Sequence, residues 1–186
     1  MANRTRTAAA MAVAAMLGAS RLSAAAEPGI APADLPPGNA HVRSSSPVIS
    51  AAIHEAMERS ATFRALVATI DASDSYVFVN EGECGHGVRA CFTNVRSSGS
   101  NRFMFVRIVP RGKTDCDLMG SIGHELRHTI EVIGQRSVRT DAERFFFYQR
   151  IGMLTVGGTR ETLAAMDAGN TVRSEVIKFN RQAKSE

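Results

Sequence analysis

The stretch DCDLMGSIGHELRHTIEVI, residues 115–133, contains the clearest structural pattern in the 186-residue chain. Its apolar residues recur every three or four positions, as they do along one side of an amphipathic α-helix. They are Leu118, Met119, Ile122, Leu126, Ile130 and Ile133. The same spacing places His124, His128 and Glu131 in a polar stripe on the opposite side. Gly134 follows directly, and glycine is common just after a helix, so we predict a helix over residues 115–133.

The polar stripe contains the pattern His124-Glu125-x-x-His128. Histidines four residues apart lie one above the other on a helix, so their rings can converge on one metal ion. A tetrahedral Zn²⁺ with two such ligands, a third ligand from elsewhere and a water is a catalytic site. Glu125 would lie beside the ion without binding it. It could then take a proton from the zinc-bound water and pass it to a leaving group, which is the mechanism behind the H-E-x-x-H motif.

The segment Gly123-His124-Glu125-Leu126-Arg127-His128 resembles the active-site helix of the zincin metallopeptidases. The resemblance implies a peptide or protein substrate and a β-strand along the substrate cleft, for which residues 103–109 are correctly placed. The pattern differs from that of metzincins, because Glu131 and Gly134 stand where those enzymes have Gly and His. Residues 123–132 are also similar to a G-H-E-L-x-H-x-x-E-V segment of uncharacterised exported bacterial proteins, a similarity that implies no particular substrate.

Gluzincins, the zincins that this pattern resembles most, take a glutamate from a later helix as third metal ligand. Glu161 is the first candidate, because it opens the last predicted helix, whose small residues allow close packing. Glu131 points in the right direction but lies about 4.5 Å beyond His128 along the helix axis. It is therefore better suited to orienting His128 than to binding the ion. Glu143 is the third candidate, although acids in a first helical turn are often only partners of the helix dipole.

The motif and the resemblance together predict an exported zinc-dependent hydrolase, a peptidase. Zn²⁺ is its expected cofactor, His124, His128 and Glu161 its expected metal ligands, and Glu125 its catalytic residue. One alternative is a hydrolase of a non-peptide amide such as a cell-wall cross-link, since the metal chemistry is the same. Another is a non-catalytic exported binding module, or an inactive zincin relative, whose histidines hold a structural metal.

The order of elements predicts an α+β fold with a small antiparallel sheet. Helical spacing marks a first helix from Pro47 with a break near Ser60, and later helices over 115–133, 141–152 and 160–181. Strands are expected over residues 76–79, 88–93 and 103–109, the first two joined as a hairpin by a Gly-rich loop. The aromatic run 145–148 is expected to pack in the core.

Two of the three cysteines, Cys84 and Cys91, flank the Gly-rich loop of this predicted hairpin. In an exported protein such a pair is expected to be oxidised, so we predict a disulfide there and leave Cys116 unpaired. The alternative is a metal site made of Cys84, His86 and Cys91, which is one ligand short of a usual structural zinc site.

The N-terminal residues are typical of a targeting segment. Arg4 and Arg6 precede an uncharged run over residues 8–19, and small residues follow at 24–26. This pattern predicts a secretory signal peptide over residues 1–26 and a secreted or periplasmic mature protein. A mitochondrial-type presequence or an Ala-rich tail is the alternative. The apolar run is shorter than the about 20 residues that cross a bilayer, so no membrane span is expected.

Residues 27–46 are rich in Pro, Gly and Ser, which predicts a disordered linker before a zincin-like domain over residues 47–186. Removal of the signal peptide would also remove three of the 22 basic residues, leaving 19 against 18 acidic ones. The mature chain would then be nearly neutral, with no basic cluster interleaved with aromatics. A nucleic-acid partner is therefore not expected.

Overall fold

The computed structural model describes residues 40–85, 87–111, 115–155 and 158–185. Its helices are α1 (Pro47–Arg59), α2 (Ala61–Asp71), α3 (Cys116–Ile133), α4 (Asp141–Ile151) and α5 (Leu163–Gln182). Its strands are β1 (Val42–Arg43), β2 (Ser75–Glu81), β3 (Ala90–Ser98), β4 (Asn101–Ile108), β5 (Met153–Leu154) and β6 (Arg160–Glu161). The α+β class is confirmed. None of the helices in the described ranges is long and apolar enough to cross a membrane.

The main sheet is mixed, with strand order β1-β2-β4-β3. β1 and β4 both run parallel to β2, and β3 runs antiparallel to β4. The prediction of a purely antiparallel sheet, with the first two long strands joined as a hairpin, is therefore wrong. The hairpin instead joins β3 to β4 through Gly99, whose φ of +58° is readily available to glycine. β2 and β3 therefore lie on opposite sides of β4.

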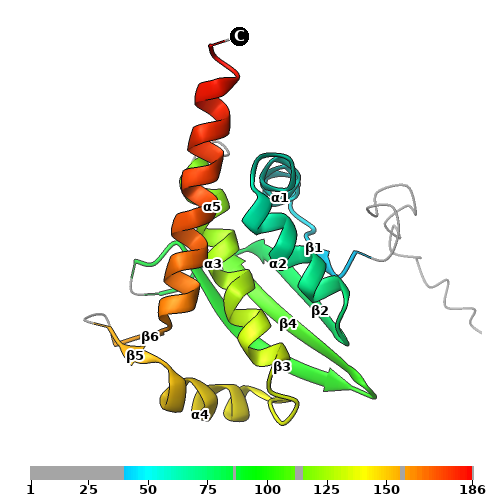
Figure 1. Cartoon of the computed structure of the whole chain (residues 1–186). Helices are drawn as coiled ribbons and strands as arrows, with labels where there is room; N and C mark the ends of the chain where they lie inside the picture. Colours follow the sequence, from blue (N-terminus) through cyan, green and yellow to red (C-terminus); the bar gives the residue numbers. More distant parts are fainter. Residues whose placement is uncertain (1–39, 86, 112–114, 156–157, 186) are drawn as a thin grey trace, which may run out of the picture. The chain divides into compact units, whose positions relative to one another are not determined.

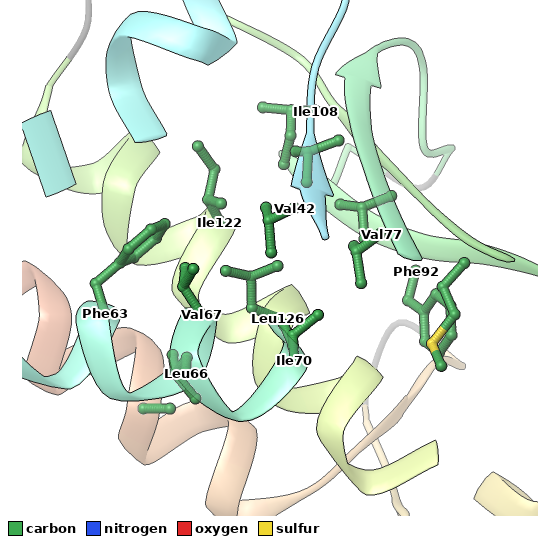
Figure 2. Packing of buried hydrophobic residues seen from close by; sticks show 14 of the residues in the cluster. Val42, Phe63, Leu66, Val67, Ile70, Val77, Phe92, Ile108, Ile122 and Leu126 are labelled. Atoms are coloured by element: carbon green, nitrogen blue, oxygen red, sulfur yellow. The ribbon is translucent and has the colours of Figure 1, made fainter. Parts of the chain in front are cut away.

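The core lies between this sheet and the helices on one of its faces (Figure 1). Alternate residues of the two central strands, such as Val77 on β2 and Met104 on β4, point into it and are fully buried. Figure 2 shows Phe63 and Ile70 of α2 in one cluster with Ile122 and Leu126 of α3, in agreement with the predicted apolar side of α3. The last helix, α5, packs mainly against α3.

The structured chain begins before the predicted domain boundary at residue 47. Val42 pairs with Val77 as part of β1, and the carbonyl of His41 accepts a hydrogen bond from the Val77 amide at 2.8 Å. The prediction of a disordered linker therefore fails for residues 40–46. The short strand β1 pairs with the edge of the sheet although the sequence around it is polar. The predicted signal peptide, residues 1–26, and linker residues 27–39 lie outside the described ranges.

A buried arginine fastens the end of α3 to the sheet. Arg102 of β4 is 2% exposed, and its guanidinium donates to the carbonyl oxygens of Val132, Ile133 and Gln135 at 2.9, 3.1 and 3.2 Å. The same group donates to Asp74 at 2.8 Å. The last carbonyls of a helix have no partners inside the helix, so Arg102 satisfies them and fixes α3 in place.

Candidate metal centre

The centre is built on α3, which carries both histidines of the motif. The rings of His124 and His128 lie 4.8 Å apart between centroids, as expected for residues one turn apart. The side chain of His124 is 21% exposed and that of His128 only 6%. The pair therefore lies at the boundary between the protein interior and the surface.

Glu161 supplies a carboxylate to both histidines. Its Oε2 lies 2.8 Å from Nε2 of His124 and 3.1 Å from Nε2 of His128. The three groups can offer one ligand atom each, all within 4.8 Å of one another. The sequence predicted that Glu161 opens the last helix, and this placement is wrong. Glu161 is the second residue of β6, directly before Thr162, which caps α5.

These residues fit a divalent metal ion. Donor atoms of a tetrahedral zinc site lie about 3.3 Å apart when the metal–ligand distances are about 2.0–2.1 Å. The two distances from Glu161 to the imidazole nitrogens, 2.8 and 3.1 Å, are slightly shorter than that value, and all three ligand atoms lie within 4.8 Å of one another. Two imidazoles and one carboxylate are also a donor set that several transition metals accept. The geometry thus allows a metal site of three protein ligands.

Glu131 orients His128 from the side opposite the candidate metal site. Its carboxylate, an acceptor when ionised, lies 3.0 Å from Nδ1 of His128, so Nδ1 donates to it and Nε2 faces Glu161. Thr162 donates to the other carboxylate oxygen at 2.6 Å. The hydroxyl of Tyr148 donates to the His128 carbonyl at 2.8 Å and lies 3.3 Å from Glu131. Such contacts typically fix the ring orientation of a metal-binding histidine.

The electrostatics of the centre follow from these contacts. Burial alone would lower the pKa of His128, but its hydrogen bonds with Glu131 and Glu161 outweigh burial and raise the pKa to about 9. Burial would raise the pKa of Glu161, yet the hydrogen bonds from His124 and His128 lower it to about 2. Glu161 is therefore a carboxylate at neutral pH, the form that binds a cation.

Glu125 follows His124 in the motif and is 5% exposed. Burial raises the pKa of this carboxyl, although the neighbouring His128 and His124 act in the opposite direction. A carboxylate with a raised pKa is a stronger base, which suits a residue that must take up a proton. Glu125 and the three candidate ligands all line the same cavity.

The cavity has a volume of about 640 Å³. Residues of β3, α3, α4, β6 and α5 form its walls, together with the loop before β3. The main-sheet strand that lines it is β3, an edge strand, and not residues 103–109 as predicted. Residues 103–108 belong to β4, which is paired on both sides and does not line the cavity.

Close packing of α3 and α5 positions Glu161 over the histidines. A Cβ atom at Gly120 would lie 2.9 Å from the carbonyl oxygen of Gly169, and one at Gly123 would lie 2.9 Å from Val172. Glycine at these positions therefore lets the two helices approach closely. The predicted close packing of the last helix against α3 is confirmed, and it involves Gly120 and Gly123 of α3 as well as Gly169 of α5.

Glu143, the third candidate ligand, does not reach the centre. Its carboxylate accepts from the Thr140 hydroxyl at 3.0 Å and from the Arg139 amide at 2.8 Å. It belongs to the N-terminal cap of α4, a role that the sequence suggested for an acid in a first helical turn.

The loop and aromatic predictions have mixed outcomes. Cys84 and Cys91 form a disulfide with 5.7 Å between their Cα atoms, so they are not metal ligands, and Cys116 is free. His86, the other member of the alternative metal site, lies outside the described residues.

Within the aromatic run 145–148, Phe147 and Tyr148 are buried as predicted. The prediction is wrong for Phe145 and Phe146, which are 56% and 60% exposed.

Two residues of the centre were not identified from the sequence. Thr162 precedes a helical stretch, which is a recognisable N-cap signal, but its bond to Glu131 depends on the tertiary fold. Tyr148 was assigned to the core without its hydroxyl contact to the metal helix.

Comparison with protein-family models, with curated proteins and with solved structures finds no match to this chain. Its function is therefore inferred from the geometry of the centre alone.

Proposed function

We propose that this domain is a zinc-dependent hydrolase that cleaves peptide bonds. The observation that carries the proposal is the position of Glu161, whose Oε2 is within hydrogen-bonding distance of Nε2 of both motif histidines. Two histidines at i and i+4 are a weak signal by themselves. A carboxylate that converges on both of them, from a segment more than 30 residues away, completes a set of three donors.

The residues divide the chemical work between binding and proton transfer. His124, His128 and Glu161 hold the metal, and Glu131 keeps Nε2 of His128 directed at it. Zinc at this site would act as a Lewis acid on a carbonyl and would lower the pKa of a water. Glu125 accepts the proton of the attacking water and then delivers it to the leaving nitrogen. Its burial beside the histidines supports this assignment.

A peptide is the amide substrate that the shape of the cavity favours. β3 lines the cavity and is paired with β4 on one side only. On its other side, Arg144 and Asp141 of α4 already bond the carbonyls of Phe92 and Thr93 and the amide of Val95. An extended peptide could add there only along Ala90 and Cys91, the first residues of β3, which line the cavity. A non-peptide amide would use the same metal chemistry but would not need an open strand edge.

Export of the protein is part of the proposal. The Cys84–Cys91 disulfide supports it, because such bonds persist in oxidising compartments such as the periplasm and the cell exterior.

The test compares the zinc-loaded domain with its Glu125→Gln variant on a library of quenched fluorescent peptides. The variant should keep its zinc and lose about a hundredfold or more of its activity, because it lacks the proton-transfer group. Glu58→Gln, a change at an exposed carboxylate of α1, is the matched control and should behave as the wild type. Full activity of Glu125→Gln would rule out the proposed mechanism. Zinc binding without cleavage of any peptide would favour a non-peptide amide or a binding module.

A further inference from the structure

The wall of the catalytic cavity is unusually rich in arginine. Arg89, Arg144, Arg160 and Arg173 all line it. Two of them have carboxylate partners close by. Arg89 contacts both carboxylate oxygens of Asp115 at 3.2 Å, and Arg173 pairs with Asp117. The charges of these two arginines are therefore compensated.

The other two arginines have no carboxylate within ion-pair distance among the described residues. Arg144 donates to the carbonyl oxygens of Phe92 and Thr93 at 3.1 and 2.7 Å. Arg160 donates to the carbonyl oxygen of Gly152 at 3.1 Å and to the side-chain amide of Gln149 at 2.7 Å. All four acceptors are neutral, so no carboxylate in direct contact balances the positive charge of either guanidinium group.

The acid one helical turn before Arg144 is already engaged elsewhere. Asp141 attracts Arg144 electrostatically. However, its two oxygens accept hydrogen bonds from the Asn94 side chain at 2.9 Å and from the Val95 amide at 2.7 Å. It is therefore shared between the sheet and Arg144 and does not form a direct ion pair.

The hydrogen-bonding capacity of these arginines is only partly used. In the described part of the chain, the buried side-chain polar atoms without a partner are the Nε atoms of Arg89, Arg144 and Arg160, and all three residues line the cavity. Buried charged donors are costly when they lack acceptors. These guanidinium groups would attract an anion in the cavity.

The charge balance of the cavity also favours an anion. The two positive charges of a divalent ion held by two neutral imidazoles would be balanced by the negative charges of the Glu161 and Glu125 carboxylates. Arg144 and Arg160 then remain as the excess positive charge of the wall. A low-dielectric cavity focuses such a field on whatever it binds.

We propose that this cavity selects substrates with a carboxylate beside the scissile amide, and that Arg144 and Arg160 provide the selecting charge. The inference rests on the proposed zinc-dependent hydrolase and specifies its substrate class. The carboxylate could belong to an Asp or Glu side chain or to the C-terminus of a peptide, since the recognised group is the same.

Two matched probes test the charge requirement directly. Succinic acid monohydroxamate combines a zinc-binding hydroxamate with a free carboxylate. The control probe keeps the hydroxamate and has a carboxamide in place of the carboxylate, so it is neutral at that end and has nearly the same shape. Titration calorimetry on the zinc-loaded domain should show the acid binding about tenfold more tightly than the amide. Arg144→Gln and Arg160→Gln should each reduce this preference. Arg144→Lys should keep most of it, since the charge remains.

Arg150→Gln is the control, because it removes a positive charge from α4 at a residue that does not line the cavity. The zinc content of every variant reports whether its centre is still folded. Equal binding of the two probes by the wild type, or a preference that survives both Gln variants, would overturn the inference and leave the hydrolase proposal standing. Failure of the wild type to bind zinc would overturn both.

A peptide library with free and amidated C-termini identifies the source of the carboxylate. Cleavage beside internal Asp or Glu in both forms would assign it to a side chain. Cleavage that amidation abolishes would assign it to the chain terminus. Cleavage without any acidic group near the bond would contradict the inference.

Discussion

Thr162 donates a 2.6 Å hydrogen bond to Glu131. The same hydroxyl accepts from the Ala165 amide at 3.1 Å and so caps α5. One side chain therefore connects the start of α5 to the residue that orients His128. Because Glu161 directly precedes Thr162, the third candidate ligand and the support of the second are fixed by the same turn of the chain.

Replacing Thr162 by valine should weaken both roles. Loss of the cap should lower the free energy of unfolding by about 1 kcal/mol. Loss of the bond to Glu131 should reduce zinc affinity about tenfold or more, as is typical when a residue supporting a metal ligand is removed. Thr162→Ser keeps the hydroxyl and should retain both properties. Denaturant unfolding and competition with a zinc chelator measure them, and equal behaviour of the two variants would contradict the assigned role.

Gly169→Ala should separate α5 from α3. An added Cβ would lie 3.0 Å from Cβ of His124 and 3.0 Å from the carbonyl oxygen of Gly120. Alanine normally favours a helix by about 1 kcal/mol over glycine, but overpacking costs about 1–3 kcal/mol. We expect a lower melting temperature and weaker zinc binding. Ser174→Ala, at an exposed position of the same helix, should cause neither effect. An unchanged or stabilised Gly169→Ala protein would show that the helices are less tightly packed than described.

Acid should loosen the contact between α5 and α2. Burial would raise the pKa of Glu175, but hydrogen bonds from Ser60 and Thr62 lower it below its ordinary value of 4.5. A carboxyl with a lowered pKa stabilises the fold above its ordinary pKa, and this stabilisation is lost as the pH falls below about 4.5. Denaturant unfolding at a series of pH values should show a smaller loss of stability on acidification for Glu175→Gln than for the wild type. Asp167→Asn, at an exposed position of α5, should follow the wild type. Parallel curves for Glu175→Gln and the wild type would refute this role.

The sequence was sufficient to locate the helices, the three long strands and the local motif of the centre, but not β1, β5 or β6. His124, Glu125 and His128 were identified because their spacing is local and a helix fixes their mutual positions. Glu161 ranked first among three candidates only by analogy with a later-helix ligand. Its actual place in β6 depends on how closely α3 and α5 pack, which involves Gly120, Gly123 and Gly169. Contacts of this kind are set by the whole fold and leave no periodic signal.

The order of strands in the main sheet was likewise beyond what the sequence could predict. Runs of β-branched and aromatic residues identified the three long strands. They did not identify their partners, since β2 and β3 would satisfy the same pattern on either side of β4. Similarly, the run 145–148 was assigned to the core from its composition. On α4 its four positions point in different directions, so Phe147 and Tyr148 are buried and Phe145 and Phe146 are not.

The central claim is that His124, His128 and Glu161 hold one zinc ion. The most direct measurement is the zinc content of the purified domain by elemental analysis, beside His128→Ala, Glu161→Gln and Glu143→Gln. Glu143 is the matched control, because it was a candidate ligand by sequence but caps α4 in the structure. We predict about one zinc per chain in the wild type and in Glu143→Gln, and loss of zinc in the other two variants. A wild type that neither contains nor takes up zinc, or a Glu161→Gln variant that binds it as tightly as the wild type, would contradict this account.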